Sequence, residues 1–298
     1  MEKPYILHFI TPTKNASPFD VNMAYDAGYT AISSYTDVKL EEVMGLVQDA
    51  IFSRGPRGVQ RTGMLIGGRD IDLAMDMLEV ARKSMVPPFE ISVFADPSGA
   101  FTTAAAMMAK VESQLKLNFG GDFHGRKVSV FGATGPVGGC AAVIAAKYGA
   151  TVELVAHRPG ADVAGKAEAY NKRYGTHIGY TDGTTDELKT QILQTTDVAL
   201  CAAAAGVRVI TLAQMAGSPT LKVVADVNAV PPTGAEGVDV MADGKPIEGT
   251  SAFGLGALAI GNVKYQVQHN LFKKMIEGQW PVYLDFLSAF ELARKDVS

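Results

Sequence analysis

The stretch Val128-Ser-Val-Phe-Gly-Ala-Thr-Gly-Pro-Val-Gly-Gly-Cys140 joins a short apolar run to an alanine-rich one that continues to Lys147. The apolar run is typical of a buried β-strand, and the alanine-rich run of a helix. Between them stand Gly132, Gly135 and Gly138, in the spacing G-x-x-G-x-x-G. In such a turn the first glycine permits the tight bend, the second lets a ligand approach the backbone, and the third lets the helix pack against the strand. The stretch therefore predicts a strand–turn–helix unit of a parallel α/β fold.

The residues before this stretch repeat the same alternation. Short β-rich runs and longer segments with helical spacing alternate, the runs at 6–11, 31–35, 64–67 and 91–95, the helical segments at 19–27, 40–51, 72–83 and 102–115. Repeated strand–helix units predict a parallel sheet covered by helices. The polar, glycine-rich segment 119–126 is typical of a linker.

These patterns predict an α/β protein of two domains. We expect an N-terminal α/β domain with a parallel sheet over residues 1–117 and a Rossmann-like domain over 118–280. Residues 281–298 predict one further amphipathic helix, which could complete the first domain.

The composition excludes several classes of protein. Of the 298 residues 47% are hydrophobic and 19% charged, which excludes a disordered chain. A net charge of −4 argues against nucleic-acid binding. The apolar runs are shorter than the roughly 20 residues that a membrane helix needs. Two cysteines cannot form a disulfide framework, and no leader is evident, so we expect a cytoplasmic protein.

The sequence predicts no metal site. Its five histidines stand singly, without the paired-cysteine or H-E-x-x-H spacing of metal centres. No G-x-S-x-G nucleophile turn occurs either. We therefore expect an organic cofactor to supply the chemistry.

The glycine turn indicates a dinucleotide as that cofactor. Thr134, Pro136 and Val137 complete the turn, and the helix that follows offers N–H groups and a positive dipole end to phosphates. The strand before the turn and the helix after it give the motif its required context. The alternative is a tight βα turn without a ligand.

The end of the next strand, 151–156, indicates which dinucleotide. NAD enzymes usually carry an acidic residue there, which holds the ribose hydroxyls. This chain has His157 and Arg158, with Lys166 further on, and a guanidinium suits the extra phosphate of NADP. We expect NADP, with NAD as the weaker alternative. A surface arginine that follows a strand by chance would give the same pattern.

Two further apolar runs end in small or polar residues. Ala203 follows the run that begins at residue 197, and Asp226 and Asn228 end the run from 223. Small residues let a flat cofactor lie close to the backbone. Asp226 and Asn228 could bind ribose or carboxamide, or could simply close the loop before two prolines.

A long helix is predicted after the glycine-rich segment that contains Gly256. Its apolar positions are Ile260, Val263, Val267, Leu271 and Met275. On a helical wheel Lys264 falls within this apolar arc, whereas Lys273 points away from it. A lysine in such a place needs a partner or a role. The alternative is a side chain whose stem lies along a groove.

In the first domain, two predicted strands are each followed by a cluster of polar residues. The clusters are residues 11–20, after the first strand, and residues 96–103, after the fourth. Ligands of open α/β sheets bind at the carboxyl ends of the strands, so both loops are candidates for the binding site. The alternative is helix capping, by Ser17 or Asp20 in one loop and by Ser98 or Thr102 in the other.

Four segments closely resemble the NADP-dependent methylene-tetrahydromethanopterin dehydrogenases of one-carbon-metabolising bacteria. They are residues 17–28, 94–106, 226–232 and 256–264, and the resemblance runs over essentially the whole chain. It implies hydride transfer from the methylene group of a reduced pterin to NADP, giving the methenyl form and NADPH. It further implies that the Rossmann-like domain over 118–280 binds NADP and that the active site lies in the cleft between the two domains. It also implies a homo-oligomer, commonly a trimer or hexamer.

The resemblance implies roles for particular residues. Lys264 and Asp20 correspond to catalytic or pterin-orienting residues, Thr102 and Thr103 to the pterin-facing loop, and Arg158 to the position that meets the NADP phosphate. The expected site comprises Lys264 and Asp20 in catalysis; Phe19, Asp96, Ser98, Thr102 and Thr103 at the substrate; and Gly132, Thr134, Gly135, Pro136, Val137, Gly138, His157, Arg158, Lys166, Ala203, Asp226, Asn228 and Gly256 at the cofactor.

Three alternatives stay open. The nearer one is a methylene-tetrahydrofolate dehydrogenase, and the further one is a non-catalytic NADPH-sensing protein. A small-acid or shikimate-type dehydrogenase is weaker, because no substrate-anchoring cluster is evident.

Overall fold

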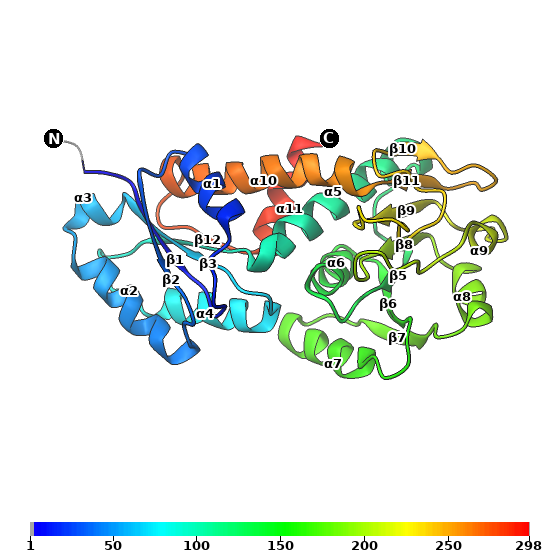
Figure 1. The fold of residues 1–298 in the computed structure, drawn as a ribbon, viewed down its shortest axis with the longest axis horizontal. Coiled ribbons are helices and arrows are strands. Elements are labelled where there is room, and N and C mark those ends of the chain that lie inside the picture. The colour runs from blue at the N-terminus through cyan, green and yellow to red at the C-terminus, as the bar shows by residue number, and fades with distance from the viewer. Residues whose placement is uncertain (1–2, 298) are drawn as a thin grey trace. The chain divides into compact units, whose positions relative to one another are not determined.

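A computed structural model describes residues 3–297 of the chain (Figure 1). The chain divides into two compact units. Unit 1 holds the residues up to Thr102 together with Tyr265–Leu292, and unit 2 holds Thr103–Lys264 together with the residues from 293 on. The first division falls inside helix α5 (Ala100–Phe119), ahead of the segment that we interpreted as a linker. Within unit 2, Lys110 of α5 forms an ion pair with Asp243, which ties this helix to β10 (Asp243–Pro246).

Unit 1 is built on a five-stranded parallel sheet in the order β12-β4-β3-β1-β2. Its strands are β1 (Ile6–Ile10), β2 (Ala31–Tyr35), β3 (Thr62–Ile66), β4 (Ser92–Ala95) and β12 (Tyr283–Leu284). Its helices are α1 (Pro18–Asp26), η1 (Leu40–Glu42), α2 (Val43–Phe52), α3 (Pro56–Val59), α4 (Ile71–Lys83) and η2 (Pro97–Gly99), with most of α10 (Ala257–Glu277) and α11 (Phe286–Asp296). The predicted alternation of parallel strands and helices is confirmed.

Helices cover both faces of this sheet, as its central strands require. Every residue of β3 and β4 is buried, which is typical of parallel strands between two helical layers. On one face Phe94 of β4 packs edge-to-face on Phe272 of α10, with ring centres 5.4 Å apart. On the other face Met64 of β3 lines a pocket together with Ala50 of α2.

The predicted C-terminal helix is present as α11, but it begins later than residue 281. The segment first adds β12 to the edge of the sheet beside β4 and only then forms α11. The N–H of Val93 donates to the carbonyl of Val282 at 2.8 Å, and Leu284 is buried. A strand of two residues is too short to show a period of its own, so only its partner strand reveals it.

Unit 2 contains a seven-stranded sheet in the order β10-β11-β9-β8-β5-β6-β7 (Figure 1). Its strands are β5 (Lys127–Phe131), β6 (Thr151–Ala156), β7 (Gly179–Asp182), β8 (Val198–Cys201), β9 (Val223–Asp226), β10 (Asp243–Pro246) and β11 (Phe253–Leu255). Its helices include α6 (Pro136–Lys147), α7 (Val163–Tyr174), α8 (Asp186–Leu193) and α9 (Leu212–Ala216). Neighbouring strands are parallel, except for the antiparallel pair β10–β11.

The order of this sheet reverses at β5. The chain continues from β5 to β6 and β7 on one side, then crosses to β8 and β9 on the other side. Ligands of open α/β sheets bind at such a switch point, outside the carboxyl ends of the strands. The glycine turn follows β5 directly and therefore lies at this point. Within residues 3–297, no helix has the length and apolarity of a membrane span.

Candidate functional site

The glycine turn after β5 has the geometry that its spacing predicts. Gly132 has a φ of +83°, and a Cβ atom built there would lie 2.3 Å from the carbonyl carbon of Ala202 at the end of β8. A Cβ on Gly138 would lie 2.6 Å from the carbonyl oxygen of Gly132. Side chains at these two positions would collide with backbone, so both glycines are required by the turn and by the packing of α6.

The N-terminus of α6 opens at this turn. Gly135 is its N-cap and, lacking a side chain, contributes no capping hydrogen bond, while Pro136 occupies the first turn. The first N–H groups of a helix have no partner within the helix, and together with the positive end of the helix dipole they attract anions. The turn can therefore receive a phosphate group.

A pocket of about 630 Å³ lies at the carboxyl ends of β5, β6 and β8. It brings together seven of the predicted cofactor residues, namely Gly132, Thr134, Gly135, Pro136, His157, Arg158 and Ala203. The lining also contains Ala202, Ala204, Val207 and Val209, whose small or branched side chains form an apolar wall. The same pocket is thus lined by the glycine turn, by the basic residues at the end of β6 and by the small residues at the end of β8.

Two basic residues of this pocket, Lys189 and Arg208, were missed by sequence reasoning. Lys189 lies on α8, and Arg208 lies in the loop after β8. The Nε of Arg208 donates to the carbonyl of Thr233 at 2.6 Å, and its guanidinium pairs with Glu236 at 3.4 Å. No spacing marks either residue in the sequence, because the sheet order alone brings them to the pocket.

The pKa of His157 is lowered in this pocket. The imidazole is half-buried, and burial lowers its pKa from 6.5, with the positive charges of Arg158 and Lys189 acting in the same direction. All three residues line the pocket. Its wall at the end of β6 is therefore a region of positive potential.

The other predicted cofactor residues are not among those that line this pocket. Val137 and Gly138 lie further along α6, and Lys166 on α7 places its ammonium 5.9 Å from the ring centre of Tyr170. A Cβ on Gly256 would lie 2.1 Å from the carbonyl oxygen of Asp239, so this glycine serves a close backbone approach.

Asp226 and Asn228 hold the loop that follows β9. The carboxylate of Asp226 accepts from the N–H groups of Asn228 and Ala235, both at 2.9 Å, and its burial raises its pKa. The side-chain amide of Asn228 accepts from the N–H of Val230 at 2.9 Å and donates to the carbonyl of Pro232 at 3.0 Å. These bonds correspond to the loop-closing alternative that the sequence left open.

In unit 1 the loop after β1 presents Asp20 on α1. Ser17 is the N-cap of α1 and accepts from the N–H of Asp20 at 3.3 Å. The Asp20 side chain is buried, and one carboxylate oxygen accepts from the side-chain amide of Gln268 on α10 at 2.6 Å. Phe19 beside it is 48% exposed. A buried carboxylate and an exposed aromatic ring thus follow the carboxyl end of β1.

The loop after β4 is organised by Asp96. This buried carboxylate accepts from the N–H groups of Phe101 and Thr102, at 2.9 and 3.2 Å, and from the Thr102 hydroxyl at 2.7 Å. Ser98, with a φ of 52°, donates to the carbonyl of Gly68 at 2.7 Å. The residue that accepts from the first turn of α5 is thus Asp96, and not Ser98 or Thr102 as in the capping alternative. Thr103 follows on the same helix, in unit 2.

Helix α10 has the predicted apolar face. Ile260, Val267, Leu271 and Met275 are buried on it, while Lys273 is exposed. Lys264 and Val263 are half-buried, so the structure places this lysine nearer the apolar face than Lys273. Within the part of the chain that the structure describes, no three His, Cys, Asp or Glu side chains form a group that could hold a metal ion.

Comparison with known proteins identifies the family of this chain. The family model described as methylene-tetrahydromethanopterin dehydrogenase, N-terminal, matches residues 18–98. An NAD(P)-dependent methylenetetrahydromethanopterin dehydrogenase of Methylorubrum extorquens (strain AM1) is 47% identical over 288 residues, which cover 97% of each chain. The chain belongs to the methylene-tetrahydromethanopterin dehydrogenase family. The predicted resemblance is confirmed.

Two further comparisons place this family member in a wider context. The bifunctional protein MdtA of the same organism is 31% identical over 295 residues, 99% of each chain. The structure of ornithine transcarbamoylase from Giardia lamblia matches with a TM-score of 0.52 and 10% identity, and the match covers 93% of this chain and 87% of the transcarbamoylase chain. That likeness shows the α/β fold alone. The matched N-terminal segment of the dehydrogenase family includes both Asp20 and Asp96.

Proposed function

We propose that this protein is an oxidoreductase that transfers a hydride from methylene-tetrahydromethanopterin to NADP⁺, forming methenyl-tetrahydromethanopterin and NADPH. The observation that carries the proposal is the pocket of unit 2, which joins the glycine turn to His157, Arg158 and Lys189. The near full-length relative, named as an NAD(P)-dependent dehydrogenase of this pterin, supports the same activity.

The residues of the pocket fit a nicotinamide dinucleotide. The glycine turn and the open N-terminus of α6 suit its pyrophosphate, and the apolar wall around Ala203 suits a flat ring. Arg158 at the end of β6 suits the 2′-phosphate that distinguishes NADP from NAD. When bound, the nicotinamide ring supplies the hydride acceptor.

The enzyme's own task in this reaction is to hold the pterin in position. Because the nitrogens of the substrate stabilise the positive charge of the product, we propose direct transfer with no covalent intermediate and no obligatory general base. Positioning the reacting atoms in near-attack geometry is then the main source of rate. We assign this positioning to Lys264 and Asp20, with Phe19 and the loop around Asp96, Ser98, Thr102 and Thr103 facing the pterin.

Lys264 would bind an oxygen or a carboxylate-like group of the pterin and so fix the ring. Asp20 would accept hydrogen bonds from the N–H groups of the pterin or adjust the electrostatic environment of Lys264. The hydrogen bond from Gln268 fixes one oxygen of Asp20, which supports an orienting role for this carboxylate. We further propose that the enzyme acts in the cytoplasm as a homo-oligomer, a trimer or hexamer, which sedimentation of the purified protein would test.

A spectrophotometric assay of NADPH formation from formaldehyde-loaded tetrahydromethanopterin tests the proposal. It is repeated with NAD⁺ and with tetrahydrofolate. We expect the fastest turnover with tetrahydromethanopterin and NADP⁺, and a large loss of turnover at saturating pterin in Lys264→Ala. The matched control is Lys273→Ala, which removes an exposed lysine from the same helix.

Three results would contradict parts of this proposal. Faster turnover with tetrahydrofolate would make the protein a methylene-tetrahydrofolate dehydrogenase. Tight nucleotide binding without hydride transfer to any reduced pterin would make it a sensor of NADPH. Full turnover in Lys264→Ala at saturating pterin would show that Lys264 does not position the substrate.

A further inference from the structure

The wall of the nucleotide pocket contains a cation that comes from a separate element. His157 and Arg158 follow β6, whereas Lys189 lies on α8, and all three line the same pocket of about 630 Å³. In the sheet β7 is the neighbour of β6, and α8 follows β7, so the topology brings α8 to the end of β6. Lys189 is also close enough to His157 to act on it electrostatically, as Arg158 does.

The Lys189 side chain is fixed along this wall. It is 13% exposed, and its ammonium lies 3.6 Å from a carboxylate oxygen of Asp186, whose own side chain is 78% exposed. That separation is longer than the roughly 2.7–2.9 Å of a strong charge-assisted hydrogen bond. The same oxygen of Asp186 accepts from the side-chain amide of Gln214 at 3.2 Å. Lys189 is thus a largely buried cation with a distant and well-solvated counter-charge.

The pocket lining therefore has two cations, Arg158 and Lys189, near the end of β6, where an NAD enzyme would have an acidic residue. A phosphate on the 2′ position of the adenosine ribose is the group of a nicotinamide dinucleotide that would sit at this strand end. An ammonium acts on a phosphate as a point charge, and a guanidinium acts as a planar fork, so the two can share one phosphate from different sides.

We propose that Lys189 is a specificity-determining residue that binds the 2′-phosphate of NADP⁺ together with Arg158, beside His157. The inference rests on the proposed function, since it assumes that the pocket holds a nicotinamide dinucleotide. It goes beyond that function because it names a residue on α8 as a source of the preference for NADP⁺. The sequence had assigned this role to the strand end and to Lys166.

The test is calorimetric titration of the purified full chain with NADP⁺ and, separately, with NAD⁺. A hydrogen bond to a charged group contributes about 1.5–3 kcal/mol, so Lys189→Gln should weaken NADP⁺ binding by roughly ten- to a hundredfold. Binding of NAD⁺ should change by less than about threefold, because it lacks the phosphate. Lys189→Arg should recover most of the affinity.

The matched control is Lys172→Gln, which removes an exposed lysine of α7 that is not among the residues lining the pocket. We expect it to bind both nucleotides as the wild type does. Thermal melts of each variant show whether the fold is retained. Equal weakening of NADP⁺ and NAD⁺ in Lys189→Gln, or no weakening of NADP⁺, would overturn the inference.

The outcomes also separate this inference from the proposed function. A wild-type protein that binds NADP⁺ no more tightly than NAD⁺ would overturn the phosphate site, even if it oxidised the pterin. A wild-type protein that loses its preference for NADP⁺ through Lys189→Gln, yet transfers no hydride from any reduced pterin, would support the phosphate site and overturn the proposed reaction.

Discussion

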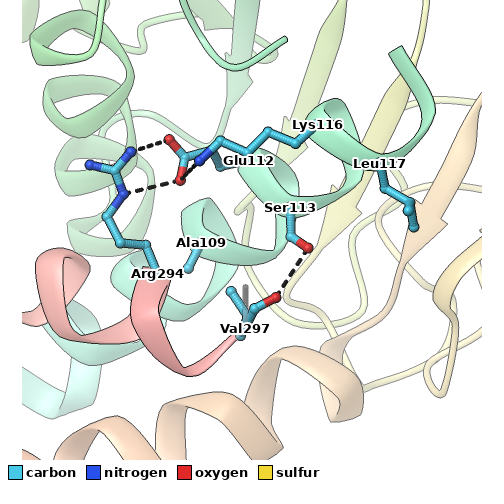
Figure 2. A pocket seen from close by; sticks show the side chains of 7 residues that line it. All are labelled: Ala109, Glu112, Ser113, Lys116, Leu117, Arg294 and Val297. Carbon is cyan, nitrogen blue, oxygen red and sulfur yellow. Dashed lines mark hydrogen bonds and ion pairs between the residues drawn. The ribbon is translucent and has the colours of Figure 1, made fainter. Parts of the chain in front are cut away.

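A buried ion pair in unit 2 allows a quantitative prediction about stability. The side chain of Glu112 on α5 is 3% exposed, and Arg294 near the end of α11 contacts both of its carboxylate oxygens, with Nε 3.1 Å from Oε2. Figure 2 shows Lys116 approaching the same carboxylate, at 3.1 Å from Oε2. The guanidinium also lies 4.8 Å from the ring centre of Tyr148. We predict that Arg294→Met destabilises the protein by leaving Glu112 without its main counter-charge.

The size of this effect follows from the burial of the two partners. Removing one member of a fully buried pair costs about 3–5 kcal/mol. Here Arg294 is 24% exposed and Lys116 remains near Glu112, so the cost falls below that range, at about 2–3 kcal/mol. In domains of roughly 150–250 residues each kcal/mol lowers the melting temperature by about 2–4 °C, which gives a decrease of about 4–12 °C.

Circular dichroism melts and urea titrations measure this difference. Lys295→Met, at an exposed position of the same helix, is the control, and we expect it to change stability by less than about 0.5 kcal/mol. The double variant Glu112→Gln/Arg294→Met removes both charges and should recover more than about 1 kcal/mol of the loss. The reasoning is refuted if Arg294→Met is as stable as Lys295→Met, or if the double variant is no more stable than Arg294→Met.

Three more predictions concern single side chains. Gly132→Ala should lower the free energy of unfolding by about 2 kcal/mol or more, since its Cβ would collide with backbone at a φ of +83°; urea titration checks this. Asp96→Ala should lower the free energy of unfolding by about 1–3 kcal/mol, because it removes the hydrogen-bond acceptor at the start of α5. A smaller loss of stability in thermal melts would contradict the capping role. Burial, with Arg54 as the smaller cause, lowers the pKa of His8 below 6.5 in the folded state, so the unfolded state binds more protons. Stability should therefore fall as the pH decreases through 6.5 toward the folded pKa, and urea midpoints of His8→Gln should lose part of this slope.

Local sequence patterns predicted most of the elements that carry the site. The runs 31–35 and 151–156 are β2 and β6, and the glycine turn ends β5 as expected. The strands that were missed are the short ones, such as β11 within the glycine-rich segment before α10. Three residues show no alternation of their own. Their pairing with β9 decides their conformation, and that pairing is a property of the assembled sheet.

The same contrast separates the residues of the pocket. Gly132 and Arg158 could be predicted, because their roles depend on the strand that immediately precedes them. Lys189 and Arg208 could not, since they reach the pocket only through the order of the strands. Asp226 is the reverse case, because the sequence suggested a role in ligand binding that its contacts do not require. A buried carboxylate at a strand end suits a ligand as well as a loop, and its hydrogen bonds to the following loop explain it without a ligand.

The three glycines of the turn differ in the atoms that a Cβ at each position would contact. A Cβ on Gly132 or Gly138 would collide with backbone, whereas a Cβ on Gly135 would lie 3.2 Å from the carbonyl of Gly132, at an ordinary φ of −84°. The fold can therefore accept Gly135→Ala with a small shift, at a cost of less than about 1 kcal/mol. A methyl group at the N-cap of α6 would still stand where a phosphate must approach the backbone. We expect Gly135→Ala to melt close to the wild type yet bind NADP⁺ about tenfold more weakly, a loss of about 1.4 kcal/mol. If calorimetry found wild-type affinity in this variant, the phosphate would have to bind elsewhere than at the turn, because the other two glycines are already explained by the backbone around them.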